Sequence, residues 1–343
     1  MLARRSTLQN KAGIPVDLPR LVPSFSSKGF PLVKISRGKC SDVDNALKLV
    51  GPHLKQSFLI SAYDVFHKLI RDSFPYIENA ELVFLDSGAY ELSPEYDSTE
   101  PKQPPYGPSR FRQSDYQTVL AGLPSRAQIV ISNFDWGTKR KPLVEQITTA
   151  QRLFNKYPQF LSNFIIKPGK DRLLNVDEVI RHIKQMRAFD VIGVTEKELG
   201  DNLIDRLRAI AKLRVGLDRE HVSAPLHIWG GLDPIITPLY FFVGSDIFDG
   251  VSWLRYAYHG GVAIYRDSYS VLHPQIGVMR ARDHAQSLAL SHKLSFLEEL
   301  TTRLRRFVDS NGQDFSMFAE NREVLERTYK TMVTEIPELR RPS

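Results

Sequence analysis

Cysteine is almost absent from this chain, because Cys40 is the only one among 343 residues. A disulfide within the chain is therefore excluded, and so is a zinc site built from several cysteines. No apolar run approaches the roughly 18 residues that a membrane-spanning helix needs. The charged N-terminal segment has no apolar stretch behind it of the kind that makes a secretory signal. We accordingly expect a cytoplasmic protein with no membrane partner.

The chain also lacks internal repeats and low-complexity blocks. Its positive charges exceed its negative charges only moderately. Lys and Arg total 46 against 39 for Asp and Glu, which gives a net charge of +7. A basic protein is suited to a polyanionic partner, although many basic proteins bind no nucleic acid. The length allows either two domains or one barrel with additions. A homodimer and partner proteins both remain open.

Short apolar runs alternate with amphipathic stretches along most of the chain. The runs are rich in Val, Ile, Leu and Phe and are bounded by Gly, Asp or Pro, which is typical of buried parallel strands. Helical patterns lie between them at 141–157, 176–189 and 202–214. Eight such strands predict a closed α/β architecture, the (β/α)₈ or TIM barrel. The predicted strands are 30–36, 56–62, 80–88, 127–135, 162–169, 189–196, 224–231 and 245–253.

The strand pattern stops after about residue 280. Residues 285–310 and 315–333 have helical patterns, and Asn311-Gly312 between them is typical of a helix end. We therefore predict a catalytic barrel over 1–280 and a C-terminal helical extension over 281–343 that packs on it. One segment within the barrel, 92–113, contains five prolines and predicts a long loop insertion.

Three aspartates lie at the C-terminal ends of predicted strands. Asp86 comes after LVFL, Asp135 after IVISNF and Asp249 after SDIF. The carboxyl ends of barrel strands share one face, so these side chains are expected to converge there. A single strand-end aspartate is more often a helix cap. Two facing carboxylates suit chemistry at an anomeric carbon, with one as nucleophile and the other handling protons. Spacing alone does not separate a retaining glycosidase from a base-exchange enzyme.

The residues around these acids resemble a known family. LDSGAYE (85–91) is similar to the DSGG(F/Y)Q signature of the tRNA-guanine transglycosylases, and GSDIFDGVSWLRYAYHGG (244–261) is similar to their segment around F-D-x-V. Looser similarities follow in family order in NFIIKPG (163–169), FDVIGVTEKELG (189–200) and HIWGGLDP (227–234), and in the helix at 291–307.

The resemblance implies a role for each matching position. Asp249 corresponds to the nucleophile that attacks C1′ and expels guanine. Asp86 corresponds to the acid/base that protonates the leaving base and deprotonates the incoming one. Tyr90 corresponds to the aromatic that stacks on the base, and Asp135 to the carboxylate that accepts hydrogen bonds from its Watson–Crick edge. Each also has an ordinary structural alternative, such as core packing for Tyr90.

Further positions are implied as contacts with the base or the polynucleotide. Lys167 replaces a family glutamine and keeps a donor for a purine O6, while Gly193 and Gly231 fall where the backbone approaches the ligand. Arg255 corresponds to an arginine near the substrate backbone. From their charge and loop positions we add four candidate nucleic-acid contacts, although such residues often only face solvent: Lys139, Arg140, Arg110 and Arg112.

The chain departs from the family in ways that bear on its substrate. The three zinc cysteines are missing and only His292 matches a zinc ligand, so we expect no metal or other cofactor and expect His292 to pack against the barrel end. One arginine of the backbone-contact segment has become Tyr258. These changes favour the branch that inserts a 7-deazaguanine, such as 7-cyano-7-deazaguanine, into DNA, with tRNA as the second choice.

Two other functions remain open from the sequence. A relative without catalytic activity, acting as a nucleic-acid-binding module or partner subunit, would have no need for both Asp86 and Asp249. A barrel hydrolase of small glycosides or nucleosides would use the same two carboxylates, but would release a free base or sugar without inserting a replacement.

Overall fold

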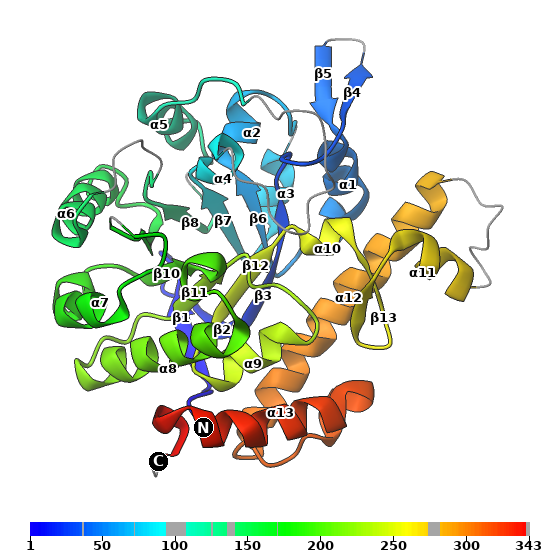
Figure 1. Cartoon of the computed structure of the whole chain (residues 1–343). Helices are drawn as coiled ribbons and strands as arrows, with labels where there is room; N and C mark the ends of the chain where they lie inside the picture. Colours follow the sequence, from blue (N-terminus) through cyan, green and yellow to red (C-terminus); the bar gives the residue numbers. More distant parts are fainter. Residues whose placement is uncertain are drawn as a thin grey trace.

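A computed structural model describes residues 1–35, 38–71, 73–93, 108–124, 126–135, 141–169, 171–273 and 282–340. Eight parallel strands close into a barrel ringed by helices, which confirms the predicted (β/α)₈ fold (Figure 1). In barrel order the strands are β3 (Arg20–Phe25), β6 (Ser57–Ser61), β7 (Leu82–Asp86), β8 (Ile129–Ser132), β9 (Leu161–Ile166), β10 (Val191–Thr195), β11 (Leu226–Trp229) and β12 (Ile247–Gly250).

Alternate residues of each strand serve two different cores. In β7, Leu82 and Phe84 point into the barrel, whereas Val83 and Leu85 join the larger core beneath the helices. Side chains on successive strand positions face opposite ways, so a strand buried on both sides needs apolar residues throughout. The interior core also includes Val16 of the N-terminal hairpin formed by β1 (Ser6–Gln9) and β2 (Pro15–Leu18), which packs into the barrel.

Helices cover the outside of the barrel, and several begin at side-chain caps. The Asn175 side chain accepts from the N–H of Glu178, and the Asn202 side chain accepts from that of Asp205, satisfying donors that a helix start leaves open. The helices of the barrel region are α1 (Asp42–Val50), α2 (Ala62–Phe66), α3 (Phe74–Asn79), α4 (Ala89–Leu92), α5 (Gln113–Ala121), α6 (Leu143–Phe154), α7 (Val176–His182), α8 (Leu203–Arg219), α9 (Ile236–Phe242), α10 (Ser252–Arg255) and α11 (Arg266–Leu272).

The first predicted strand was wrong. Residues 30–35 of the predicted strand 30–36 do not enter the barrel, because β4 (Leu32–Ile35) pairs antiparallel with β5 (Gly38–Ser41) in a separate hairpin. The barrel strand is β3, whose sequence RLVPSF carries an arginine, a proline and a serine and so lacks a continuous apolar run. A third hairpin, β13 (Ala257–His259) with β14 (Val262–Ile264), follows α10.

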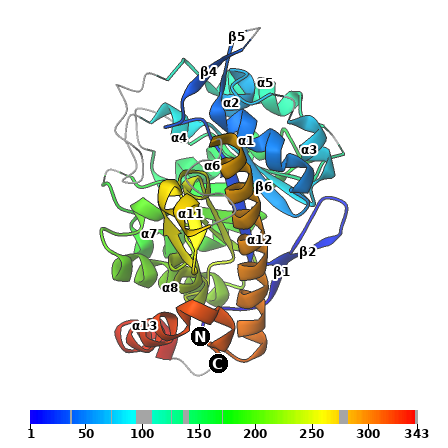
Figure 2. The same cartoon turned by 90° about the vertical axis from the view of Figure 1, so that its right-hand side faces the viewer.

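The C-terminal helices agree with the prediction. The long helix α12 (Arg282–Asp309) runs along the side of the barrel, and α13 (Arg322–Glu335) crosses one end of it (Figure 2). Asn311 and Gly312 both have positive φ, as expected of a helix-ending turn. Leu290, Leu297 and Leu304 are at most 3% exposed, so the leucine stripe of α12 is a packing face. Both helices share the large core with the barrel.

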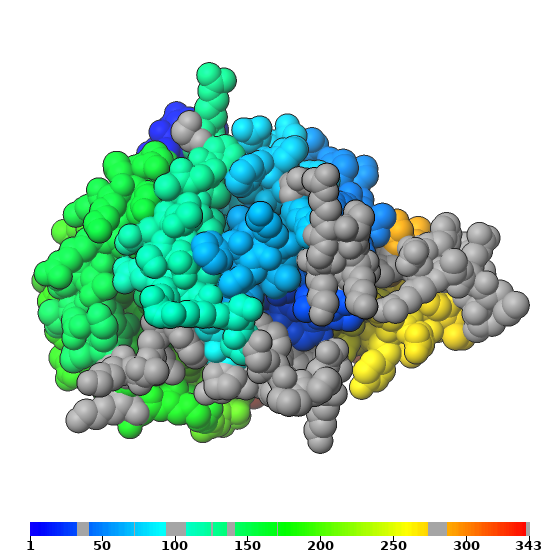
Figure 3. Space-filling model, turned by 90° about the horizontal axis from the view of Figure 1, so that it is seen from above, coloured from blue at the N-terminus to red at the C-terminus, as the bar shows by residue number. Residues whose placement is uncertain are grey.

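All eight strands point the same way, so the barrel has two distinct ends. We call the end at the strands' carboxyl termini, where α4 and α10 begin, the mouth, and the opposite end, where both chain termini lie, the base (Figure 1). Seen from above, the atoms of β6 to α5, in blue to blue-green, make up much of the visible face (Figure 3). The loop insertion predicted at 92–113 lies for the most part outside the described residues.

Candidate active site at the barrel mouth

The three predicted aspartates meet at the mouth. Asp86 is the last residue of β7, Asp249 lies near the end of β12, and Asp135 follows β8 by three residues. Asp86 is 8% exposed and Asp249 is 5% exposed. Asp135 and Asp249 both help to raise the pKa of Asp86, so the three carboxyl groups share one electrostatic environment. Their roles in chemistry stay predictions.

Asp249 is held by donors from three directions. The Ser24 hydroxyl donates to Oδ2 at 2.8 Å. Nε2 of His227 lies 3.0 Å from Oδ1, and the backbone N–H of Gly230 donates to the same oxygen at 3.2 Å. Because β3 and β11 are the barrel neighbours of β12, the closed sheet itself brings these donors to the carboxylate. Hydrogen bonds of this kind stabilise the negative charge that a nucleophilic carboxylate must carry.

Asp86 has the opposite environment. Burial raises the pKa of Asp86 well above its usual range, and the carboxylates of Glu91, Asp135 and Asp249 raise it further against a single opposing hydrogen bond. That bond comes from the N–H of Gly88, 3.1 Å from Oδ2. Gly88 has a φ of +87°, and a Cβ there would lie 2.8 Å from Cβ of Tyr63, so this turn requires glycine. A carboxyl group whose pKa is raised in this way is suited to serve as a general acid.

Two further buried carboxyl groups interact electrostatically with Asp86 or with each other. We call the three groups the acid cluster: Asp64, Glu91 and Asp86. Burial raises the pKa of Asp64 to about 7, with help from Asp86, and burial with help from Asp64 raises the pKa of Glu91 to about 7. The Ser26 hydroxyl donates to Glu91, and the Ser27 N–H donates to Asp64 at 2.7 Å. The sequence analysis missed Asp64, although it follows β6 as Asp135 follows β8.

Lys167 and Asp135 lie side by side as an ion pair. Nζ of Lys167 is 3.3 Å from an oxygen of Asp135 and 3.3 Å from one of Glu198, and it donates to the Thr195 hydroxyl at 2.9 Å. Burial acts to lower the pKa of Lys167, but the two carboxylates outweigh it and the net pKa is raised. The Ser87 hydroxyl donates to the other oxygen of Asp135 at 2.6 Å. The mouth thus offers adjacent positive and negative groups on its β8–β10 side.

Tyr90 is flanked by two cations. Nη2 of Arg255 donates to the Tyr90 hydroxyl at 2.9 Å, and Nζ of Lys28 lies 4.5 Å from the centre of its ring. Lys28 is 1% exposed and donates to the Ser93 carbonyl at 3.0 Å. Arg255 at the end of α10 therefore joins that helix to α4, and it holds the ring on which a base is predicted to stack.

The two predicted glycines each have a packing reason within the barrel. A Cβ on Gly193 would lie 2.5 Å from Nε1 of Trp229 and 2.7 Å from Oδ1 of Asn163. A Cβ on Gly231 would lie 2.7 Å from Cγ2 of Ile228. At both positions the glycine backbone packs closely against protein side chains, whereas the prediction was a close approach to a ligand.

The predicted nucleic-acid contacts are placed only in part. Arg110 and Arg112 are exposed on either side of the buried Phe111, at the start of α5. The segment is anchored where the N–H of Ser109 donates to the Tyr63 hydroxyl at 2.7 Å. Lys139 and Arg140 lie outside the described residues.

His292 is not packed against the barrel end, and that expectation was wrong. His292 is exposed on α12, where its ring contacts the Tyr269 hydroxyl and lies near His273. His259 and His273 approach to 3.4 Å between ring nitrogens, and these histidines line a surface groove of about 240 Å³. Across the part of the chain that the structure describes, no group of three His, Cys, Asp or Glu residues has a geometry that could hold a metal.

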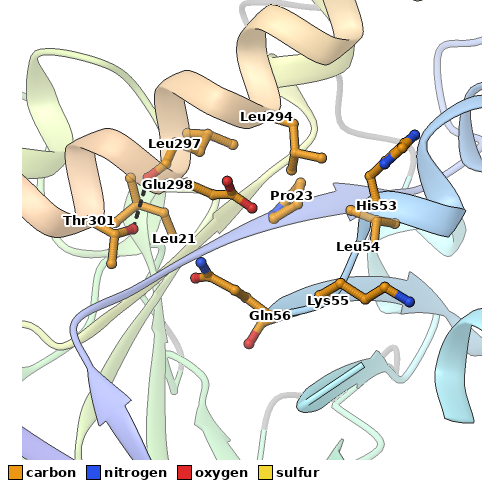
Figure 4. A pocket seen from close by; sticks show the side chains of 11 residues that line it. Leu21, Pro23, His53, Leu54, Lys55, Gln56, Leu294, Leu297, Glu298 and Thr301 are labelled. Atoms are coloured by element: carbon orange, nitrogen blue, oxygen red, sulfur yellow. Dashed lines mark hydrogen bonds between the residues drawn. The ribbon is translucent and has the colours of Figure 1, made fainter. Parts of the chain in front are cut away.

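A separate void lies away from the mouth, between α12 and strands β3 and β6 (Figure 4). Leu294 and Leu297 of α12 face Pro23 across it, and Glu298 of the same helix also lines it. Its volume of about 10 Å³ is enough for roughly one water molecule, so it is a packing defect and not a ligand site.

The fold and the mouth together define a parallel (β/α)₈ barrel with buried carboxyl groups converging at its carboxyl-terminal end. No protein-family model matches this chain, and no curated protein matches it either. Among the described helices, none is both long and apolar enough to cross a membrane.

Proposed function

We propose that this protein is a guanine transglycosylase that replaces a guanine in a nucleic acid with a 7-deazaguanine. The observation that carries the proposal is the pairing at one mouth of Asp86, whose pKa is raised well above its usual range, with Asp249, which three donors hold. A carboxyl group with a raised pKa suits the role of acid, and a carboxylate that hydrogen-bond donors hold in place suits the role of nucleophile. The sequence similarity to the tRNA-guanine transglycosylases supports the choice of substrate.

The proposed reaction has two balanced halves. In the first, a carboxylate oxygen of Asp249 forms a bond to C1′ while the C1′–N9 bond breaks, and the departing guanine takes the electron pair and the proton of Asp86. In the second, N9 of the incoming 7-deazaguanine attacks C1′, its proton passes to Asp86, and the bond between C1′ and Asp249 breaks. The enzyme is restored, and no oxidant, reductant or metal is required.

Neighbouring residues have matching roles in this proposal. The paired groups of Asp135 and Lys167 present an acceptor and a donor to a base edge. Tyr90 offers an aromatic ring, and stacking of a base on such a ring is worth about 1–3 kcal/mol. The guanine must leave its stack to enter the mouth, at a cost of a few kcal/mol. The basic charge of the chain suits a polynucleotide.

DNA is the favoured substrate and tRNA the second choice, with 7-cyano-7-deazaguanine as the incoming base. This preference rests on the missing zinc cysteines and on Tyr258. Tyr258 is buried and packs against Phe296, so in place of an arginine it makes a core contact. Either substrate would be met in the cytoplasm, and that location is part of the proposal.

An exchange assay with labelled base tests the proposal. Labelled guanine or 7-cyano-7-deazaguanine is offered with double-stranded DNA, single-stranded DNA and tRNA in parallel, and label in the polymer is counted. We expect incorporation into DNA that Asp249→Asn abolishes. Release of free guanine without incorporation would instead identify a hydrolase. Salt-sensitive binding without either reaction would identify a binding module.

A further inference from the structure

A buried histidine lies directly behind the proposed nucleophile. The His227 side chain on β11 is fully buried. Its ring stacks on Trp229, with 4.5 Å between centroids and 27° between planes, and it meets Phe84 edge-on at 5.3 Å. Both neighbours belong to the interior core of the barrel. The imidazole is therefore held in one orientation by packing, before any hydrogen bond is considered.

The two ring nitrogens of His227 have different partners. Nε2 lies 3.0 Å from Oδ1 of Asp249, and Nδ1 lies 2.8 Å from Nδ2 of Asn163. An amide nitrogen only donates, so Nδ1 must be the acceptor in the second contact. In a neutral imidazole the proton then resides on Nε2, where it faces the carboxylate.

The orientation of the Asn163 amide decides this tautomer, and the surroundings of Gly193 bear on that orientation. A Cβ on residue 193 would lie 2.7 Å from Oδ1 of Asn163 and 2.5 Å from Nε1 of Trp229. Glycine at this position therefore leaves room for both atoms. Both atoms are buried and have no hydrogen-bond partner among the described residues. Flipping the amide would turn its NH₂ group toward the indole N–H and oppose donor to donor.

The two oxygens of Asp249 are consequently unequal. Oδ1 receives two fixed donors, Nε2 of His227 and the backbone N–H of Gly230. Within the described part of the chain, Oδ2 receives only the Ser24 hydroxyl, which can rotate and which also accepts from the N–H of Gly250 at 3.1 Å. An oxygen with two rigid donors is the poorer nucleophile and the better holder of returning charge.

We propose that His227, fixed by Asn163 as its Nε2–H tautomer, is a positioning residue that pins Oδ1 of Asp249 and leaves Oδ2 as the oxygen that attacks C1′. This inference rests on the proposed function. In the covalent intermediate Oδ1 is the ester carbonyl, still bound by the His227 and Gly230 donors. When the C1′–Oδ2 bond breaks, its electron pair returns to the carboxylate and the same two donors stabilise the departing charge.

The tautomer is tested by nitrogen-15 NMR of the histidine rings at pH 7.5, which needs no substrate. The spectrum of His227→Gln identifies the signals of His227. We expect a proton on Nε2 and none on Nδ1, and we expect Asn163→Leu to weaken this preference. A proton on Nδ1, or on both nitrogens, in the wild-type protein would overturn the inference.

The positioning role is tested in the exchange assay. His227→Leu is expected to lower exchange by about 10²-fold, the usual effect of losing one preorganised donor. His227→Gln keeps an N–H donor and is expected to recover at least about a tenth of wild-type exchange. The control is His221→Asn, an exposed histidine after α8. Thermal unfolding of each variant reports whether it is folded.

The outcomes separate this inference from the proposed function. Wild-type exchange in a folded His227→Leu variant would overturn the positioning role and leave the guanine exchange standing. Equal loss in the Leu and Gln variants would also overturn it, because a purely packing role predicts no rescue by a donor. If the wild-type protein exchanges no base with any nucleic acid, the proposed function fails and the assignment of the attacking oxygen falls with it.

Discussion

Buried charges occur at both ends of this barrel, but they are arranged in opposite ways. At the base, Asp246 is 1% exposed and lies 3.4 Å from Arg4 and 3.9 Å from Arg214. It also accepts from the Ser6 hydroxyl and the Leu226 N–H, both at 2.9 Å. At the mouth, the acid cluster of Asp64, Glu91 and Asp86 brings like groups together, so their pKa values rise.

The contrast separates an end whose charges suit a stable fold from an end whose carboxyl groups suit the proposed chemistry. A buried aspartate with every oxygen satisfied by cations and donors is what a stable fold requires. Buried carboxyl groups that repel one another oppose folding whenever they are ionised, and such groups gather at functional sites. Asp246 and Asp249 are only three residues apart, yet they belong to different ends.

The largest expected effect separates these two aspartates by activity. Asp249→Asn removes the proposed nucleophile and is expected to lower exchange by at least about 10³-fold. Asp246→Asn keeps an acceptor at the base and is expected to retain exchange per folded molecule. The measurement is the initial rate of label incorporation, normalised to folded protein. Equal losses of exchange activity in the two variants would contradict the assignment of Asp249 to chemistry and Asp246 to folding.

The second prediction concerns stability at the base. Asp246→Ala leaves the buried Leu226 N–H without its acceptor and the buried Arg214 guanidinium with Asp218 as its remaining carboxylate, and is expected to cost about 1–3 kcal/mol in the free energy of unfolding. Urea denaturation measures it, with Lys141→Ala in the exposed pair with Glu145 as the control that changes little. A loss no greater than that of the control would contradict the role given to Asp246.

The third prediction concerns pH dependence at the mouth. The folded pKa of Glu91 is about 7, above its ordinary value of 4.5, so the folded state binds this proton more tightly than the unfolded state does. Folding stability is therefore lost as pH rises from about 4.5 through about 7. Glu91→Gln removes this loss and is expected to be more stable than wild type at pH 8, by about 1–3 kcal/mol, but not at pH 4.

Urea denaturation at pH 4, 6 and 8 measures this difference. Glu145→Gln, at an exposed position, is the control. If the stability of Glu91→Gln relative to wild type does not rise between pH 4 and pH 8, ionisation of the acid cluster does not destabilise the fold.

The smallest expected effect concerns the exposed arginines beside Phe111. If Arg110 and Arg112 contact phosphates, each Arg→Ala change should lower the slope of log affinity against log salt by about 1. Arg327→Ala on α13, at the base, is the control that leaves the slope unchanged. Unchanged slopes in the Arg110 and Arg112 variants would remove these two residues from the nucleic-acid surface.

The sequence predicts the fold well where apolar patterns are continuous. Seven barrel strands and both C-terminal helices lie where period and length place them. The strand β3 escapes prediction because Arg20 is held at the base by Glu81, and Pro23 and Ser24 interrupt the apolar pattern. The same Ser24 donates to Asp249 at the mouth, so a polar side chain of the candidate site also interrupts the apolar pattern of the strand.

The candidate site is predictable only where residues follow strands directly. Asp86, Asp135 and Asp249 stand at strand ends and their convergence follows from the parallel barrel. The contacts of His227 and Glu91 depend on which strands become neighbours and on the depth of burial, and a linear pattern contains neither. His227 lies in the short strand LHIW, and the only sequence signal for it is a polar residue within an otherwise apolar run.

The most direct test of the account is the site of covalent attachment in a trapped reaction. Wild-type protein is incubated with guanine-containing nucleic acid, denatured and digested with trypsin, and the modified peptide is sequenced by mass spectrometry. Asp249 lies in the peptide from residue 220 to Arg255, which also contains Asp233 and Asp246. We predict a sugar attached to Asp249 alone. Attachment at another residue, or none in a reaction that exchanges base, would contradict the account.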